Sequence, residues 1–360
     1  MAVSTTNRSI DYNALLTTTL TNQRKELVDQ VGAANYFYYR LRELGKFRET
    51  SDLGERLKLN LMYELTETTT YAGFDVLPTA TVDGITAAFY DWANAVTAVV
   101  ISGDEKAKNR GKYQLINLLE AKGNQARMSI REFYGKAFLQ GNGINSPSDV
   151  LTPFTNPSNL STFITPLPRL VQYDPTVSNT VGDINQSTAV NNKGVYWWRN
   201  KTKNSTSSTF AGFRKELRNL YNSCGLGMGG MPDIHLTDQS TFEMYVEMLT
   251  AFHHNTSYAR ADIPFKNVAF NDGVVTWDEN VIDAQGGSTT QSTSSGTWYM
   301  LNSEFLEFWA DAENNMTPTA AQKPVNQDAT VAHIMFRGAT GTSRRNKHGV
   351  MGGIDTAIAS

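Results

Sequence analysis

The stretch DEKAKNRGKYQLINLLEAKGNQARMSIREFYGKAFL, from Asp104 to Leu139, is the longest segment of this sequence in which apolar residues keep a helical period. These residues recur at steps of three, four or seven, which places them on one side of a helix. They are Leu115, Leu119, Ala126, Ile130, Phe133 and Ala137. A continuous helix of this length would span roughly 50 Å, enough to cross a whole domain.

The ends of this segment carry residues that suit helix ends. Asp104 and Glu105 favour the N-terminal end of the helix dipole, and Gly141 and Gly143 supply a flexible stop beyond its C-terminal end. Because glycine costs about 1 kcal/mol relative to alanine inside a helix, we also expect a bend or break near Gly111. The fold should therefore be organised around one long helix.

The composition indicates a globular chain of more than one domain. With 360 residues, 40% of them hydrophobic, it can build a real core. It contains no long apolar run and no signal-peptide pattern, so we expect a soluble protein made in a cytoplasm. The net charge of −3 argues against a generally basic nucleic-acid binder, and the single cysteine, Cys224, excludes an intrachain disulfide and a cysteine-based zinc site. Local basic groups remain: Arg40, Arg42, Lys46 and Arg48, and Arg337, Arg344, Arg345, Lys347 and His348.

The N-terminal part of the chain predicts an arm, a helix and a hairpin. Residues 1–22 are polar and suggest an extended or partly ordered arm, and Thr21–Leu44 keeps a helical spacing. A strand with one covered face is then predicted by alternating leucines, with a second strand around Thr68–Phe74. The alternating leucines are Leu57, Leu59 and Leu61. Too little sequence lies nearby to cover them, so we expect the hairpin to project and meet a partner surface.

The rest of the chain is predicted to be a mixture of strands and helices. Ile85–Ile101 is strand-like, although its alanines leave a helix possible, and prolines after Gly143 indicate a domain transition. Lys201–Thr209 is expected to be a surface loop. The other predicted elements are a helix over Phe210–Tyr221, a strand over Pro232–Thr237 before a helix capped by Asp238 or Ser240, two strands around Asn271-Asp272-Gly273, and final strands at Trp298–Leu301, Glu304–Ala310 and Ala329–Phe336.

No group of residues indicates an active site. Gly225–Gly230 is similar to a phosphate-binding loop, but a helix precedes it, a strand follows it, and no Lys-Ser/Thr pair comes after it. His253 and His254 are adjacent, so on a helix they would point about 100° apart. We therefore predict no catalytic residue, no metal ligand and no cofactor. A nucleotide-dependent enzyme that uses the glycine-rich turn is the alternative from another class.

Four short motifs resemble one branch of the major capsid proteins of tailed bacteriophages. The order of arm, hairpin, long helix, proline-rich crossover, α/β region and return strands resembles the same family over nearly the whole chain. The motifs are Tyr71-Ala-Gly-Phe-Asp75, Val181-Gly-Asp-Ile184 before Tyr196-Trp-Trp-Arg-Asn200, Trp298-Tyr-Met-Leu-Asn302, and Arg344-Arg-Asn-Lys-His-Gly-Val350. The resemblance implies the α+β fold of the Hong Kong 97 type.

The resemblance also implies how the chain is divided and what it does. The implied regions are an N-terminal arm and helix (1–49), an extended β-hairpin (50–84), a peripheral domain with a spine helix (85–150), a mainly axial domain (151–300) and strands returning to the peripheral domain (301–360). The implied function is a self-assembling, non-enzymatic subunit of an icosahedral phage head. A shell protein of a bacterial nanocompartment is the alternative within this fold.

The same resemblance implies the partners. These are the chain itself, in hexamers and pentamers, separate scaffolding and portal proteins, and packaged double-stranded DNA on the inner face, with no membrane. Assembly would take place in the host cytoplasm and the product would be the virion. Some members cross-link Lys to Asn between subunits, but no partner for Lys58 can be identified here.

The subunit contacts are predicted at the hairpin and at the basic C-terminal group. The candidates are Leu57, Leu59, Leu61, Tyr71, Phe74, Arg344 and Arg345. The basic group has two possible roles: contacts to phosphate, or ion pairs with carboxylates such as Asp311 and Glu313 of a neighbour. We favour the ion pairs, because charge complementarity fixes the register of a subunit that is packed on several sides.

Overall fold

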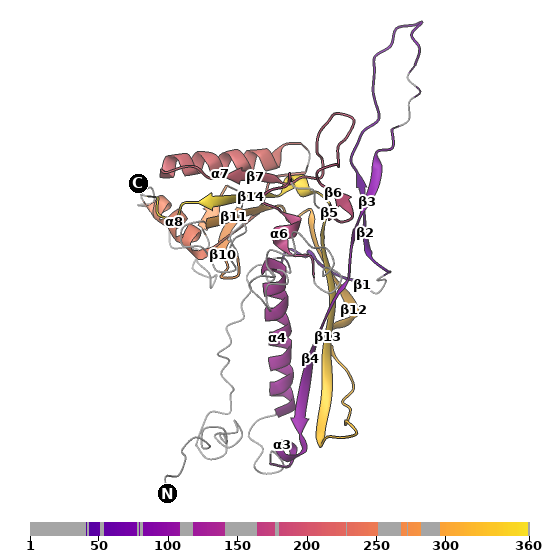
Figure 1. Cartoon of the computed structure of the whole chain (residues 1–360), viewed down its shortest axis with the longest axis vertical. Coiled ribbons are helices and arrows are strands. Elements are labelled where there is room, and N and C mark those ends of the chain that lie inside the picture. Colours follow the sequence, from indigo (N-terminus) through magenta and orange to yellow (C-terminus); the bar gives the residue numbers. More distant parts are fainter. Residues whose placement is uncertain are drawn as a thin grey trace. The chain divides into compact units, whose positions relative to one another are not determined.

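The computed structural model of the chain describes residues 41–358 with several gaps (Figure 1). The positions left out inside that range are 42, 51–53, 78, 80–81, 109–117, 141–163, 177–179, 228, 251–267, 272 and 282–295. The predicted arm, most of the predicted helix at Thr21–Leu44, Gly111 and the two adjacent histidines therefore lie outside the described residues. The chain forms two compact units: a smaller one that includes Ala95–Glu132 and Glu313–Phe336, and a larger one with Asn35–Asn94, Phe133–Ala312 and Arg337–Ser360.

A mixed six-stranded sheet forms part of the larger unit, with the strand order β7-β14-β11-β8-β10-β9. β11 is antiparallel to both of its neighbours, whereas β7 runs parallel to β14 and β10 runs parallel to β8. All residues of β8 and β11 are buried. The strands are β7 (Lys201–Asn204), β14 (Gly349–Ile354), β11 (Gly296–Leu301), β8 (Ile234–Thr237), β10 (Gly273–Trp277) and β9 (Val268–Phe270).

Two helices, α7 (Phe210–Gly225) and α8 (Gln239–Thr250), pack on this sheet. The apolar face of α7, with Phe213 and Leu217 fully buried, belongs to the same core cluster as Trp298 of β11. The predicted strand, cap and helix are confirmed, because the Asp238 carboxylate accepts a hydrogen bond from Thr241 N at 3.1 Å. The same carboxylate accepts one from Thr297 N at 2.8 Å, which ties the start of α8 to β11.

The larger unit also contains several short elements, and most of them contribute to a second core cluster. They are β1 (Phe47–Thr50), β2 (Leu57–Met62), β3 (Ile85–Tyr90), α6 (Leu167–Leu170), β5 (Thr180–Val181), β6 (Ile184–Asn185) and the 3-10 helix η6 (Arg345–Lys347). β2 and β3 pair with each other, as do β5 and β6. Leu167 and Leu170 of α6 are fully buried in this cluster together with Trp198.

The remaining elements are α3 (Gly103–Lys108), α4 (Leu118–Gln140), β4 (Ala93–Ser102), β12 (Leu306–Pro318) and β13 (Ala329–Thr342). The three strands and β1 form a sheet with the order β1-β12-β13-β4. In the smaller unit, Lys122 Nζ of α4 donates to Val100 O at 2.9 Å and Glu105 Oε2 at 2.8 Å, which joins α4 to β4 and α3. The predicted long helix is confirmed over Leu118–Gln140, with Ala126 and Ile130 buried on one side.

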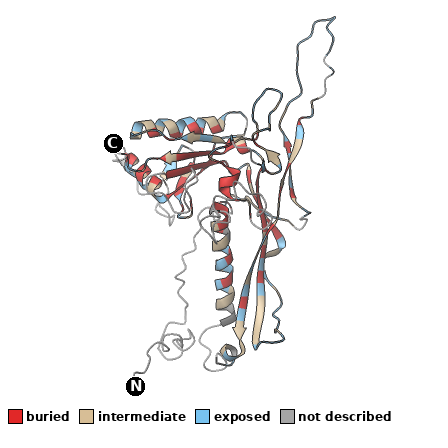
Figure 2. Ribbon diagram, in the orientation of Figure 1, coloured by how far each residue is buried: buried red, intermediate tan, exposed pale blue. Residues whose placement is uncertain are grey.

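Two sequence-based predictions of local structure are wrong. Residues 68–74 form no strand, because the partner of β2 is β3. Lys201–Asn204 is not a loop but the edge strand β7, whose polar residues suit a strand that has only one neighbour. Figure 2 shows the buried residues gathered in the six-stranded sheet and the exposed ones along the loop beyond β2 and β3.

Candidate subunit-contact surface

The strands β2 and β3 form the stem of a long loop. Residues 63–84, here called the extended loop, connect the two strands, and residues 63–77 run away from the strands in Figure 1. In the stem, Leu57 lies opposite Tyr90 and Leu61 lies opposite Thr86. Leu57 and Leu61 are only 8% and 7% exposed, because they belong to the core of their own subunit.

The premise that too little chain of the same subunit lies near the stem leucines is therefore wrong. The strand β13, which is distant in sequence, packs against the stem. A Cβ atom on Gly341 of β13 would lie 2.7 Å from the Tyr90 ring and 3.3 Å from Leu59 Cδ1. Glycine at this position lets β13 approach the stem, and Leu59 also packs against the same core cluster.

The stem leucines should stabilise the isolated subunit. We expect Leu61→Ala to lower the free energy of unfolding by about 2–5 kcal/mol, the usual cost of a cavity left by a buried leucine. Urea unfolding followed by circular dichroism measures this loss. The matched control is Met62→Ala on the same strand, because Met62 is 71% exposed and should change stability by less than about 0.5 kcal/mol. Equal effects of the two variants would contradict the assignment of Leu61 to the core.

The exposed apolar residues lie farther out, in residues 65–77 of the extended loop, here called the tip. The exposed fractions are 72% for Leu65, 70% for Tyr71, 105% for Phe74, 96% for Val76 and 57% for Leu77. Soluble monomers rarely gather apolar side chains in this way. Tyr71 and Phe74 were predicted as contacts from the sequence, whereas the other three were missed, because they follow neither a helical nor a strand period.

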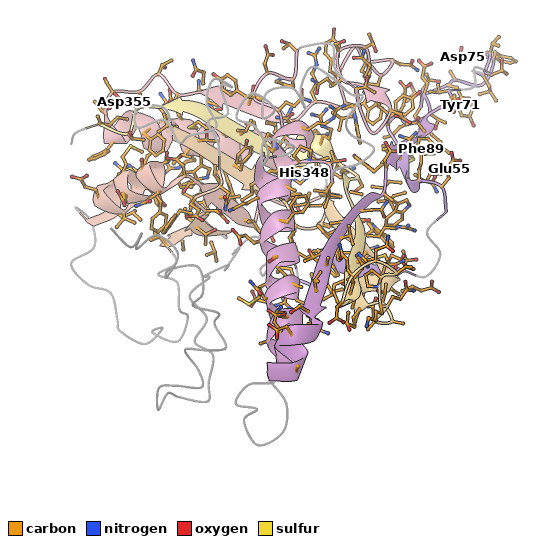
Figure 3. All side chains as sticks on the ribbon, turned by 60° about the horizontal axis from the view of Figure 1, so that its bottom comes forward. Glu55, Tyr71, Asp75, Phe89, His348 and Asp355 are labelled. Atoms are coloured by element: carbon orange, nitrogen blue, oxygen red, sulfur yellow. The ribbon has the colours of Figure 1, made fainter. Side chains whose placement is uncertain are left out.

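A small turn shapes the outer part of the tip. Asp75 N donates to Ala72 O at 2.8 Å, and Ala72 N donates to Asp75 Oδ2 at 2.7 Å. Such a turn satisfies two backbone N–H groups locally. In Figure 3, Tyr71 and Asp75 lie at the outer end of the loop, away from Phe89 and Glu55 at the stem. The tip thus presents apolar side chains far from the core of its own subunit.

The basic C-terminal group does not form a surface. Arg345 is fully buried, and its guanidinium donates to Leu170 O at 2.9 Å, Gln186 Oε1 at 2.7 Å, Trp198 O at 2.9 Å and Asn200 Oδ1 at 3.2 Å. Burial lowers the pKa of Arg345 to about 10, so the group is still charged near neutral pH. The prediction of Arg345 as a contact to DNA or to another subunit is therefore wrong, because these four acceptors already surround it.

Two other basic residues of this group, Lys347 and Arg344, differ in their exposure and in their contacts. Lys347 is 2% exposed, and its Nζ donates to the carbonyl oxygens of Gly225 at 3.4 Å and of Leu226 and Gly227 at 3.1 Å. The glycine-rich turn thus directs carbonyl oxygens at a cation, the opposite of a phosphate-binding loop. Arg344 is exposed and lies over the Phe305 ring, 5.2 Å from its centroid.

The carboxylates proposed as partners of Arg344 and Arg345 also differ in exposure. Asp311 lies in β12 beside Thr50 of β1 and is only 1% exposed, so it offers no accessible charge to a neighbouring chain. Glu313 is exposed. Of the two arginines, Arg344 alone keeps the position that a subunit contact needs, and its role there stays a prediction.

Two histidines are buried at the six-stranded sheet, His235 within β8 and His348 between η6 and β14. His235 Nδ1 lies 3.4 Å from Trp298 Nε1, which donates to it, and burial lowers the pKa of His235 to about 4. His348 Nδ1 accepts from Asn302 N at 3.2 Å, so its proton is on Nε2, 3.0 Å from Thr342 Oγ1. Burial, and then the charge of Arg345, lowers the pKa of His348 to about 3. Both imidazoles are neutral in the folded subunit.

These histidines should make the subunit sensitive to acid. Because their folded pKa values lie below the unfolded value of about 6.5, the unfolded chain binds more protons, and stability is lost as the pH falls from about 6.5 towards 4. We expect each histidine to give a slope of about 0.7 kcal/mol per pH unit between pH 7 and 6, where the unfolded imidazole is only partly protonated, and about 1.2 kcal/mol between pH 6 and 5, measured by urea unfolding at pH 7, 6 and 5. His235→Phe should remove about half of this slope, and His333→Gln, which changes an exposed histidine, should leave it unchanged. A slope that survives the loss of both buried histidines would refute the assignment.

Three further observations concern metal ligands, the cysteine and membrane-spanning helices in the described part of the chain. It contains no group of three His, Cys, Asp or Glu side chains placed to hold a metal ion. Cys224 is buried, and burial raises the pKa of its thiol to about 12. Among the described residues, no helix is both long and apolar enough to cross a membrane.

Solved structures identify the fold, although no protein-family model and no curated protein sequence matches the chain. A chain of the cyanophage A-1(L) capsid is 13% identical, with a TM-score of 0.63 over 93% of this chain and 97% of that one. The chain has the fold of phage capsid proteins. A chain of the native GTA particle capsid (9% identity, TM-score 0.59, 93% and 95% covered) and one of the capsid of Myoviridae phage XM1 (9%, 0.54, 94% and 98%) share it.

The α+β fold of the Hong Kong 97 type, expected from the sequence motifs, is therefore confirmed. The match covers nearly the full length of this chain and of the capsid chains. The boundaries at residues 49, 84, 150 and 300, which were implied by the resemblance, stay predictions. The phage capsid-protein fold here carries the apolar tip at the end of its extended loop.

Proposed function

We propose that this chain is the major capsid protein of a phage, a structural subunit that assembles into an icosahedral head around double-stranded DNA. The observation that carries this proposal is the apolar tip on a capsid-protein fold. An exposed apolar tip on a monomer promotes aggregation unless a defined partner covers it. The exposed apolar residues of this tip are Leu65, Tyr71, Phe74, Val76 and Leu77.

The energetics favour a second copy as that partner. Full burial of one large apolar side chain contributes roughly 1.5–3 kcal/mol, so a covered tip can supply several kcal/mol per subunit. In a closed symmetric shell every subunit both gives and receives such contacts, and the gain is repeated around the assembly. Hexamers and pentamers are the capsomers that this proposal implies.

The other partners are part of the same proposal. We expect scaffolding and portal proteins during assembly in the host cytoplasm, packaged DNA on the inner face, and the mature virion as the final location. With a net charge of −3 and both Arg345 and Lys347 buried, contacts to DNA phosphates should be few and weak. The subunit would act by enclosure, without catalysis.

Purification and electron microscopy test the proposal. The chain is expressed alone and with candidate scaffolding proteins, and the products are examined by sedimentation and by negative-stain microscopy. Closed shells or capsomer rings are expected. A small soluble oligomer that melts at higher temperature when a nucleotide is added would overturn the proposal in favour of an enzyme. Shells that enclose a protein cargo instead of DNA would indicate a nanocompartment.

A further inference from the structure

The base of the extended loop is held by a segment of its own subunit, residues 180–199. The strands β5 and β6 in this segment are joined by Gly182 and Asp183, which both have positive φ angles, 61° and 63°. Gly182 O accepts a hydrogen bond from Phe89 N of β3 at 3.1 Å. A Cβ atom on Gly182 would lie 2.9 Å from Ala88 Cβ, so only glycine allows this turn to lie against the stem.

An arginine fork joins the same turn to the beginning of β2. Arg56, the residue before β2, donates from Nε to Asp91 Oδ1 at 2.6 Å and from Nη2 to Asp183 Oδ1 at 3.2 Å, and its Nη1 pairs with Asp183 Oδ2. The two carboxylates raise the pKa of Arg56, chiefly through the hydrogen bond to Asp183. A bidentate fork fixes direction as well as distance, so it aligns the stem with the β5–β6 turn.

A second attachment lies where the loop leaves the stem. The Tyr63 ring stacks on Trp197, with centroids 4.9 Å apart and planes at 20°, and Asn192 N donates to Glu64 Oε1 at 2.7 Å. Tyr63 OH also donates to Asp83 O at 2.6 Å, which ties the outgoing and returning chains together. The loop is thus braced on one flank at two successive points.

The bracing segment is held together by contacts within itself, and Val181 and Trp198 place it in the core. Trp198 is 1% exposed, and its Nε1 donates to Val181 O at 2.8 Å. Arg199 Nε donates to Gln186 O at 3.0 Å, and its guanidinium lies 3.5 Å from the centroid of the Tyr196 ring. A segment held in this way can transmit the rigidity of the core to the loop that it touches.

We propose that residues 180–199 act as a clamp that sets the direction of the extended loop in the free subunit, before any neighbour binds. Arg56, Glu64 and Trp197 are its positioning residues. The role of the clamp in assembly rests on the proposed capsid function, but the direction of the loop is a property of the single chain. A loop that is already aligned loses less conformational freedom when its tip docks, so the contact is stronger for the same buried area.

Spin-label distance measurements on the unassembled subunit test the clamp. Cysteines are introduced at Val76 in the tip and at Lys215 on the exposed side of α7, both in the larger unit; Cys224 is fully buried, and a chain without the added cysteines checks that it stays unlabelled. Double electron–electron resonance then gives the distribution of distances between the labels. With the clamp intact the distribution should be narrow. The double variant Arg56→Gln/Glu64→Ala, which changes no core residue, should broaden it at least about twofold.

The control is Lys58→Gln, an exposed residue on the same stem, which should leave the distribution unchanged. A broad distribution in the unmodified chain, or an equally narrow one in the double variant with native circular dichroism, would overturn the clamp. These results do not depend on shells. If the unmodified chain never assembles but the double variant still broadens the distribution, the capsid function fails and the clamp stands.

Discussion

Replacing Phe74 and Val76 with aspartate should abolish shell formation and leave the folded subunit intact. Both side chains are almost fully exposed in the single chain, at 105% and 96%, so their replacement removes no contact of the core. We expect the free energy of unfolding to change by less than about 0.5 kcal/mol. In a docked tip the same two carboxylates would lose their water, a cost of several kcal/mol per buried ion. Sedimentation of the purified variant should show subunits or small oligomers instead of shells.

The matched control adds the same charge to the same loop. Thr68 and Thr69 are exposed and polar, so Thr68→Asp/Thr69→Asp brings two carboxylates without removing apolar surface. This variant should still form shells, at a reduced rate if charge repulsion slows the encounter. If the Phe74/Val76 variant assembles as well as the control, the tip is not a subunit contact, and the exposed apolar residues need another explanation.

The local patterns of the sequence predicted much of the fold correctly. The spacing of Ala126 and Ile130 gave α4 its buried side, and Asp238 caps α8, because a helix period and a cap depend only on residues a few positions apart. The strands around Asn271 were also predicted correctly, since a tight turn sets their pairing. The pairing of strands that are distant in sequence depends on tertiary contacts and was not predicted. The partner of β2 begins at Ile85, beyond the whole extended loop, and no local rule identifies it.

The candidate surface was predicted only in part, and for a physical reason. Leu57 and Leu61 alternate as half-buried strand residues do, but the pattern cannot say whether the covering chain belongs to the same subunit. Leu65, Val76 and Leu77 lie in a loop and follow no period, so only coordinates reveal their exposure. Charged residues usually lie on the surface of a protein. Arg345 is buried instead, because polar acceptors that are distant from it in sequence converge on its guanidinium.

Substitution of Arg345 should lower the stability of the subunit more than substitution of most other residues. Its four acceptors, on Leu170, Gln186, Trp198 and Asn200, all lie within residues 170–200, far from Arg345 in sequence. A planar guanidinium can serve them together, whereas the compact ammonium of lysine cannot. Because its pKa of about 10 stays well above neutral, the charge and its donors persist at pH 7. Its contribution to stability should not vary between pH 5 and 8.

Arg345→Met should lower the free energy of unfolding by about 3–5 kcal/mol, because it removes four hydrogen bonds from a charged donor, each of which contributes about 1.5–3 kcal/mol before the cost of burying the charge is subtracted. The methionine fills a similar volume but makes none of the four hydrogen bonds; Asn200 Oδ1 keeps the one from Gln172 N at 3.1 Å. Each buried acceptor that loses its donor costs about 1–3 kcal/mol, and relief from burying a charge offsets only part of that cost. Urea unfolding is measured in the Phe74→Asp/Val76→Asp background, so that shell contacts do not add to the apparent stability.

Arg344→Met is the matched control for this prediction, because Arg344 is adjacent in sequence but exposed. It gives up a contact over the Phe305 ring that should contribute no more than about 1 kcal/mol. The two adjacent arginines thus test different properties: Arg345 tests the stability of the subunit, and Arg344 tests its predicted contact with a neighbour. A large loss for Arg345→Met with a small one for Arg344→Met places the first in the core, whereas equal and small losses would mean that water or a rearranged side chain can replace the guanidinium. In that case the buried network would matter for specificity of packing rather than for stability.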